Sequence, residues 1–333
     1  MKVQSTSATD VVVCDVCPRM CHLHPSQVGW CGVRMRLNDD VAPDPRQGWT
    51  VASVGHVEDH PLFHFYPGMR TLSVGSVGCT AACTFCQNWE LALAPTLTPS
   101  WSLRRTYSDD YLLEMAQMRR CEAISFTFNE AVVWIEGVER LAQQAKAHHL
   151  RTILVTNGFL TVHTLERLSP WLDAIKLDLK GYNDEVSTSQ ARIALAPILG
   201  IMDMIQALGL WIEVSTVIVP GIQDSSAAVA ALVNHILAHG GPDVPWHLQR
   251  FFPAYGLANQ SAGAIADLQR IRIRALEMGL KYVYISNVPG IAERSTQCHR
   301  CKQVVASRQN AIVQRLPTRC PTCQEHFVGV GLT

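Results

Sequence analysis

Residues 71–89, TLSVGSVGCTAACTFCQNW, join a short apolar run to a loop that carries three cysteines. The run TLSVGSV has the composition of a buried strand, and Cys79, Cys83 and Cys86 follow it in a C-x3-C-x2-C spacing. Three thiolates this close can hold one iron–sulfur cluster, and because a [4Fe–4S] cluster normally takes four cysteines, one iron would stay open for chemistry. The alternatives are a structural zinc site completed by a histidine, or partly buried free thiols.

Strand-like and helix-like segments alternate after this loop. Six further strand-like runs follow, AISFTF, RTILVT, DAIKLDL, WIEVSTVIV, WHLQRFF and KYVYIS, and segments of helical periodicity lie at 110–119, 131–146, 162–168, 227–239 and 265–278. This repetition indicates an α/β fold with parallel strands joined by right-handed crossovers. Periodicity alone leaves a TIM-like barrel and a doubly wound sheet both open.

Polar residues stand at the carboxyl ends of these runs. They are Asn129 and Glu130, Asn157, and Asp178 with Lys180. In either architecture the loops at that end converge on one pocket. Taken singly, each residue has a structural explanation as a helix cap, a turn or a solvated ion pair. Taken together, on successive strand ends, they indicate a binding site.

The composition excludes several classes of protein. The 333 residues include 28 Lys+Arg and 28 Asp+Glu and are 48% hydrophobic, which argues against a disordered chain and against nucleic acid as a main partner. The apolar run at 193–202 is broken by Pro197 and Gly200, far short of the ~20 residues of a membrane span. Twelve cysteines are too few for a secreted disulfide scaffold and many for a cytosolic enzyme, so we expect a cytoplasmic protein with metal or redox chemistry.

The tail carries a second cysteine group. Cys298 and Cys301 form one C-x2-C pair, and Cys320 and Cys323 form another, eighteen residues later. This spacing is typical of a zinc ribbon, and an auxiliary iron–sulfur cluster is the alternative. Composition places the boundaries of a Cys-rich N-terminal metal-binding segment at 1–70, a central domain at 71–290 and this tail at 291–333.

A third cysteine group lies near the N-terminus. Cys14, Cys17, Cys21 and Cys31 have a C-x2-C-x3-C-x9-C spacing, which leaves zinc and an auxiliary iron–sulfur cluster both open. Cys121 has no partner in the sequence and is interpreted as a buried thiol.

A few other residues are weaker candidates. His60, His64 and His247 are possible acid–base or substrate groups, although a lone histidine is more often structural. Glu213 and Ser215 alternate with apolar neighbours in the fifth run, so we expect both to point to one face, into a barrel if the fold is one.

The chain resembles a radical S-adenosylmethionine (radical SAM) enzyme, and more narrowly the AmmeMemoRadiSam-system radical SAM proteins, relatives of the pyruvate formate-lyase activating enzymes. The motifs that carry the resemblance are CDVCPRMC, VGWCGVR, HPLFHFYPG, GCTAACTFCQNW, FTFNEA, TNGF, LDLK, EVSTVIVPG, PWHLQRFFPAY and SNVPG, and they span nearly the whole chain. The resemblance implies a partial TIM-like (β/α)6 barrel with a Cys-rich N-terminal segment and a zinc-ribbon-like tail.

The resemblance also implies roles for the strand-end residues. Cys79, Cys83 and Cys86 would ligate three irons of a [4Fe–4S] cluster, and the amino and carboxylate groups of S-adenosylmethionine (SAM) would bind the fourth. Phe85 would lie near the adenine. The remaining contacts to SAM would come from Asn129 and Glu130 at the methionine amino group, Asn157 facing the pocket, and Asp178 with Lys180 at methionyl or ribose groups.

The implied activity is reductive cleavage of SAM to methionine and a 5′-deoxyadenosyl radical that abstracts hydrogen from a substrate. The electron would come from a flavodoxin or ferredoxin, and the substrate would be a protein, as in glycyl-radical activation, or a small molecule. Ala131 stands where this group has Pro, and Asp59-His60 stands where a basic pair is usual. Since these departures lie near the expected substrate, they leave the substrate open and keep 3-amino-3-carboxypropyl transfer as an alternative. A non-catalytic iron–sulfur or zinc scaffold is a separate alternative, which loss of a cluster cysteine would favour, but Cys79, Cys83 and Cys86 are all present.

Overall fold

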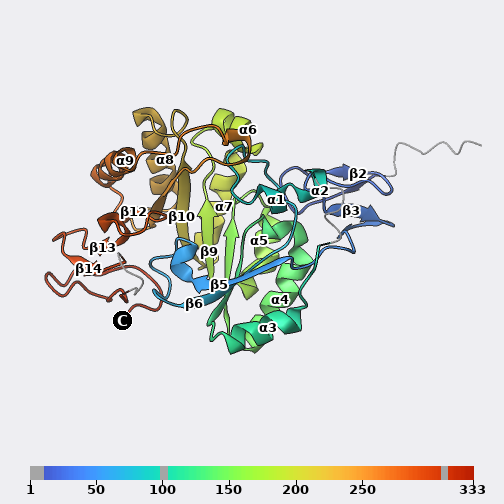
Figure 1. Ribbon diagram of the computed structural model, residues 1–333, viewed down its shortest axis with the longest axis horizontal. Helices are drawn as coiled ribbons and strands as arrows, with labels where there is room; N and C mark the ends of the chain where they lie inside the picture. The colour runs from blue at the N-terminus through green and yellow to red at the C-terminus, as the bar shows by residue number, and fades with distance from the viewer. Residues whose placement is uncertain (1–10, 98–103, 309–313) are drawn as a thin grey trace, which may run out of the picture.

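The centre of the protein is one eight-stranded sheet (Figure 1). The computed structural model describes residues 11–97, 104–308 and 314–333. All seven predicted strands are present in the sheet and pair in parallel: β6 (Arg70–Gly75), β7 (Ala123–Phe126), β8 (Arg151–Thr156), β9 (Ala174–Asp178), β10 (Trp211–Ile218), β11 (Trp246–Arg250) and β12 (Val283–Ile285). The strand β5 (Val51–His56), which was not predicted, pairs antiparallel to β6 at one edge.

The order of the strands decides between the two architectures. Strands β6 to β12 lie in chain order, and a right-handed crossover between such neighbours always returns the helix to the same face of the sheet. A doubly wound sheet instead requires a reversal of strand order. Six strand–helix units precede β12, and the sheet order ends at β5 and β12 without pairing these two edge strands. The prediction of an α/β partial barrel is therefore confirmed.

The helices follow the strands as the periodicity predicts. They are α1 (Trp89–Ala92) and α2 (Ala94–Leu97) after the cysteine loop, then α3 (Asp109–Met118), η3 (Ala131–Trp134), α4 (Ile135–Ala147), α5 (Val162–Leu168), η4 (Ser169–Trp171), α6 (Asp184–Ala191), α7 (Ala196–Ala207), α8 (Ser226–His239), η5 (Tyr255–Leu257) and α9 (Ile265–Glu277). Ser108, Thr161 and Ser225 cap α3, α5 and α8 by accepting a backbone N–H. Helix α7 was not predicted; Pro197 lies in its first turn, where a missing N–H costs nothing.

Strand residues alternate between an apolar and a polar side. In β9, Ile175 and Leu177 belong to the main hydrophobic core, whereas Lys176 and Asp178 line a cavity on the opposite side. In β10, Glu213 and Ser215 are on that same polar side, as the alternation predicts, since Ser215 contacts Asp178. The inside of the partial barrel is therefore polar, and its charged groups must be paired.

Segments from both ends of the chain pack against the barrel. The N-terminal part contains β1 (Val12–Val13), β2 (His22–Leu23), β3 (Arg34–Leu37), β4 (Asp40–Pro43) and η1 (Val57–Asp59), and the tail contains η6 (Ala292–Arg294), β13 (Thr296–Gln297) and β14 (Val304–Ala306). Figure 1 shows β2 and β3 on one side of the molecule and β13 and β14 on the other. Within the described residues, no helix has the length and apolar character needed to cross a membrane.

A buried polar network joins the tail to the barrel. The carboxylate of Glu213 accepts the backbone N–H groups of Phe63 and His64 at 2.9 and 2.8 Å, and His247 Nε2 lies 2.7 Å from it. His64 in turn lies 2.7 Å from both the Tyr284 hydroxyl and a tail carbonyl. Glu213, His64 and His247 are fully buried, and buried polar groups need hydrogen-bond partners. These contacts supply such partners, so all three residues have a structural role here.

Candidate functional site

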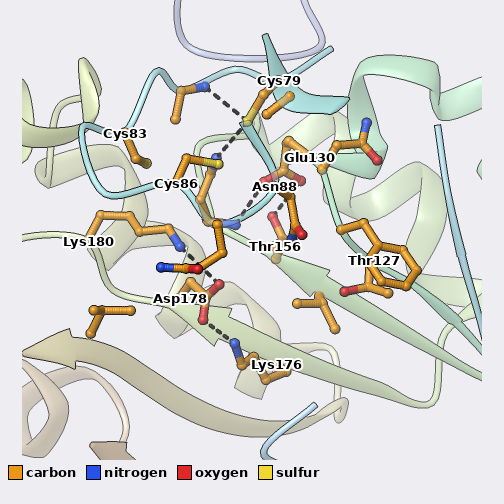
Figure 2. Close-up of a pocket in the computed structure, with 18 of the residues that line it drawn as sticks. Cys79, Cys83, Cys86, Asn88, Thr127, Glu130, Thr156, Lys176, Asp178 and Lys180 are labelled. Carbon is orange, nitrogen blue, oxygen red and sulfur yellow. Dashed lines mark hydrogen bonds and ion pairs between the residues drawn. The ribbon is translucent and has the colours of Figure 1, made fainter. Parts of the chain in front are cut away.

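A cavity of about 250 Å³ opens at the carboxyl ends of the strands. Figure 2 shows the cysteine loop on one wall of this cavity and the polar strand ends on another. The structure brings together the residues singled out in the sequence: Cys79, Cys83, Phe85, Cys86, Asn129, Glu130, Asn157, Asp178 and Lys180 all line it.

Two asparagines hold the cysteine loop in place. The Asn129 side chain accepts the backbone N–H of Ser76 at 3.1 Å and donates to the Gly78 carbonyl at 2.8 Å. The Asn157 amide donates to Thr80 Oγ1 at 3.1 Å. Asn129 follows β7, which pairs with β6, and Asn157 follows β8, the next strand of the sheet, so two strand ends each fix one part of the loop that leaves β6. The contacts of these asparagines therefore orient the three cysteines, and direct contact with SAM stays a prediction for both.

Glu130 presents a fixed carboxyl group to the cavity. Thr156 Oγ1 donates to one oxygen at 2.8 Å, and the backbone N–H of Asn157 donates to the other at 2.8 Å. Burial raises the pKa of Glu130 to about 7, although these two donors favour the charged form. Each carboxylate oxygen can still accept a further hydrogen bond, so an ammonium group can bind here.

A row of charged side chains runs along β9. Lys176 and Asp178 lie on β9, and Lys180 follows its last residue by two positions. Asp178 contacts both ammonium groups and the Ser215 hydroxyl, and it lies 3.0 Å from Lys180 Nζ. Burial would raise the pKa of Asp178, but the two ammonium groups hold it well below its usual range. Lys176 was missed in the sequence, although the alternation in AIKLDLK places it on the same face as Asp178.

The three thiols lie beside a positive charge, with Cys83 buried and Cys79 and Cys86 partly buried. Burial raises the pKa of the Cys83 thiol to about 12, and the Lys180 ammonium opposes this rise. The thiols therefore keep their protons until iron replaces them. Three thiols, a carboxyl group and an ammonium group line one cavity. This set of groups fits a [4Fe–4S] cluster with an amino-acid moiety bound to it.

The structure separates the three candidate histidines. His60 lines the cavity with Asp59 and Gln249, and its Nε2 lies 2.7 Å from Ser73 Oγ. Burial lowers the pKa of His60 to about 4, so its imidazole is neutral at neutral pH. His64 and His247 instead belong to the buried network around Glu213.

The tail cysteines form a compact group. The sulfur atoms of Cys298 and Cys323 lie 3.6 Å apart, as do those of Cys301 and Cys320, and all four lie within 4.8 Å of one another. A tetrahedral zinc ion with Zn–S bonds of about 2.3 Å places its sulfurs about 3.8 Å apart. The spacing therefore fits one zinc ion.

Comparison with known proteins agrees with this geometry. The family model of the Radical SAM superfamily matches residues 73–233. An uncharacterized protein of Methanocaldococcus jannaschii is 30% identical over 319 residues, which cover 94% of each chain. This chain belongs to the radical SAM superfamily. The predicted superfamily is confirmed, and its chemistry is reductive cleavage of SAM at a [4Fe–4S] cluster; membership of the narrower AmmeMemoRadiSam-system group stays a prediction.

Two further relatives of this radical SAM protein match over shorter lengths. The isethionate sulfite-lyase activating enzyme of Desulfovibrio desulfuricans is 30% identical over 110 residues, 32% of this chain and 35% of that enzyme. A radical SAM methyltransferase from Sphaerobacter thermophilus superposes with a TM-score of 0.52 at 18% identity and covers 66% of each chain. The match thus spans just under two thirds of the methyltransferase, and at this identity it shows the fold alone.

Proposed function

We propose that this radical SAM protein binds a [4Fe–4S] cluster through Cys79, Cys83 and Cys86 and uses SAM to abstract hydrogen from a substrate. The observation that carries the proposal is the cavity that these three thiols line together with Glu130 and Lys180. When bound, the cluster and SAM supply reductive cleavage of a sulfonium C–S bond. The chain's own residues bind, orient and shield the reactants.

Charged residues on opposite walls would orient SAM. Glu130 would accept hydrogen bonds from the methionine ammonium group, and Lys180 would pair with the methionine carboxylate. Asp178 holds the Lys180 ammonium at 3.0 Å and so acts as a positioning residue. Phe85, which is buried in the cavity wall, would contact the adenine. Such charge-assisted contacts give orientation as well as affinity.

The substrate would enter on the side of η1. Asp59, His60 and Gln249 line the cavity there and have no assigned contact with SAM. A neutral His60 can donate or accept one hydrogen bond, whereas Asp59 favours a cationic or hydrogen-bond-donating group. Resemblance to a sulfite-lyase activating enzyme supports a protein substrate of the glycyl-radical type, with a small molecule as the alternative.

The proposed reaction also needs an electron donor, and the proposed structure includes a metal ion in the tail. A reduced flavodoxin or ferredoxin would supply the electron. The tail quartet would bind zinc, as its sulfur spacing supports. All twelve cysteines are free of disulfides, which suits a reducing compartment such as the cytoplasm.

Anaerobic reconstitution with iron and sulfide tests the proposal. The wild-type protein is expected to consume SAM under reduction and to release 5′-deoxyadenosine. Cys83→Ala should remove both the catalytic cluster and SAM consumption, whereas Cys121→Ala, which changes a buried cysteine outside the three groups, should leave both intact. Unchanged SAM cleavage in Cys83→Ala would refute the ligand assignment. Release of methylthioadenosine instead would replace hydrogen abstraction by 3-amino-3-carboxypropyl transfer.

A further inference from the structure

The N-terminal cysteines form a second thiol group next to the catalytic loop. Cys14, Cys17, Cys21 and Cys31 all line one small cavity in the N-terminal segment. Thr80, which directly follows the first catalytic cysteine in the chain, lines the same cavity. The two thiol groups are therefore neighbours in space, although 47 residues lie between Cys31 and Cys79 in the chain.

Direct contacts hold the two loops together. Arg19 Nε and Nη2 both donate to the Thr80 carbonyl at 3.0 Å. On the catalytic loop, Gly78 has a φ of +88°, and a Cβ atom there would lie 2.8 Å from the Cys31 carbonyl. The backbones thus approach so closely that only glycine fits without a shift.

The spacing between sulfur atoms separates this group from the tail quartet. Across the described ranges of the chain, the tail cysteines are the one group of three or more potential Cys, His, Asp or Glu ligand atoms that lie within 4.8 Å of one another. No three of the N-terminal sulfurs therefore lie within 4.8 Å of one another, and they do not form the compact tetrahedron that the tail sulfurs form. The catalytic trio is likewise outside this limit. A [4Fe–4S] cluster needs the wider spacing, because irons and sulfides lie between its thiolates.

A buried arginine beside the N-terminal cysteines has a side-chain N–H group that makes no hydrogen bond within the described part of the chain. Arg34 lines the thiol cavity, and its side chain is only 6% exposed. Its Nη atoms bind Glu136 at 3.0 Å, but its buried Nε has no hydrogen-bond partner among the described residues. An unpaired buried donor is costly, and a cluster sulfide or thiolate would accept it. Arg19 also lines the cavity, and its guanidinium group stacks over the Trp30 ring at 3.9 Å from the ring centroid.

We propose that Cys14, Cys17, Cys21 and Cys31 bind a second [4Fe–4S] cluster, adjacent to the catalytic loop, while the tail quartet binds zinc. Charge alone does not distinguish the metals, because zinc and a cubane with four thiolates are both anionic. The sulfur spacing carries the choice between the two metals, whereas the Arg34 donor, which a zinc-bound thiolate or a cluster sulfide would both accept, supports an anionic centre of either kind. With four protein ligands this second cluster has no open iron, so it cannot bind SAM in the manner of the catalytic one.

The test removes the catalytic cluster first. The triple variant Cys79→Ala/Cys83→Ala/Cys86→Ala, reconstituted anaerobically with iron, sulfide and zinc, is expected to retain about four irons and about one zinc per chain, with the electron paramagnetic resonance signal of a reduced cubane. Adding Cys17→Ala should remove the iron and leave the zinc. Adding Cys298→Ala instead should remove the zinc and leave the iron. Adding Cys121→Ala, the matched control, should change neither.

Two results would overturn the assignment. One is a triple variant with two zinc ions and no iron, and the other is iron that survives Cys17→Ala. Retained tail zinc reports that the variants with Cys17→Ala and Cys121→Ala are folded, and retained iron reports the same for the variant with Cys298→Ala. In the otherwise wild-type chain, Cys17→Ala should lower the iron content from about eight to about four, which gives a second measurement. None of these readouts depends on SAM cleavage, so the test stands apart from the proposed function.

Discussion

Replacing Glu130 by glutamine tests how the cavity recognises SAM. The carboxyl oxygens of Glu130 accept from Thr156 Oγ1 and from the Asn157 N–H, each at 2.8 Å, and the side chain is 2% exposed. If this group also binds the methionine ammonium, Glu130→Gln removes a charge-assisted hydrogen bond. Such a bond contributes about 1.5–3 kcal/mol, which corresponds to a roughly 10- to 150-fold rise in the Kd for SAM.

The assay compares two ligands on the reconstituted protein. Methylthioadenosine keeps the adenine, ribose and sulfur of SAM but lacks the amino-acid moiety. We expect Glu130→Gln to weaken SAM binding, measured by calorimetry under exclusion of oxygen, and to leave methylthioadenosine binding unchanged. Glu139→Gln is the matched control, because Glu139 lies on α4 and pairs with Arg167 away from the cavity lining.

The two binding constants distinguish direct recognition of the SAM ammonium group by Glu130 from an effect of Glu130 on the shape of the cavity. Equal losses for both ligands would show that Glu130 shapes the cavity through Thr156 and Asn157 but does not bind the ammonium. An unchanged Kd for SAM would refute the orientation proposed above. Iron content must match that of the wild type, so that a lost cluster is not mistaken for lost affinity.

Three further predictions concern stability and metal content. Burial raises the pKa of Glu58 from 4.5 to about 7, so between these two pH values the folded protein keeps a proton that the unfolded chain releases. The free energy of unfolding should therefore fall by about 3 kcal/mol as the pH rises from about 4.5 to about 7. Urea unfolding of Glu58→Gln should not show this fall. Asp178→Asn leaves the buried ammonium groups of Lys176 and Lys180 without a counter-charge and should lower the free energy of unfolding by about 3–5 kcal/mol. Adding Lys176→Met should recover much of this loss, and additive losses in the double variant would contradict the prediction. Cys298→Ala should abolish zinc binding while the iron content stays constant, and zinc that persists in elemental analysis would count against the tail site.

Much of the fold followed from local patterns. The seven strand runs between residues 71 and 286 and five of the helices are visible as alternation of two periodicities. Helix α7 was hidden because Pro197 and Gly200 read as breaks in its pattern, and β5 was hidden because a short edge strand carries little periodicity. Whether the parallel strands form a partial barrel depends on their order, which no local pattern contains.

Part of the candidate site could likewise be predicted from the sequence, and part required the structure. The spacing of Cys79, Cys83 and Cys86 directly indicates a shared metal centre, because residues so close along the chain can reach one cluster. The roles of Asn129 and Asn157 as clamps on the cysteine loop required the structure, since their partners lie on a different strand connection.

The sequence by itself determined the superfamily, the three groups of cysteines and the alternation that points charged residues into the barrel. Each of these depends on the type and spacing of residues that lie close together in the chain. Only the tertiary structure showed that the tail sulfurs lie 3.6 Å apart in pairs, that the N-terminal sulfurs are spread more widely, and that this second group adjoins the catalytic loop. Spacing along a chain limits which atoms can meet, but distances through space are set by how the strands and loops pack.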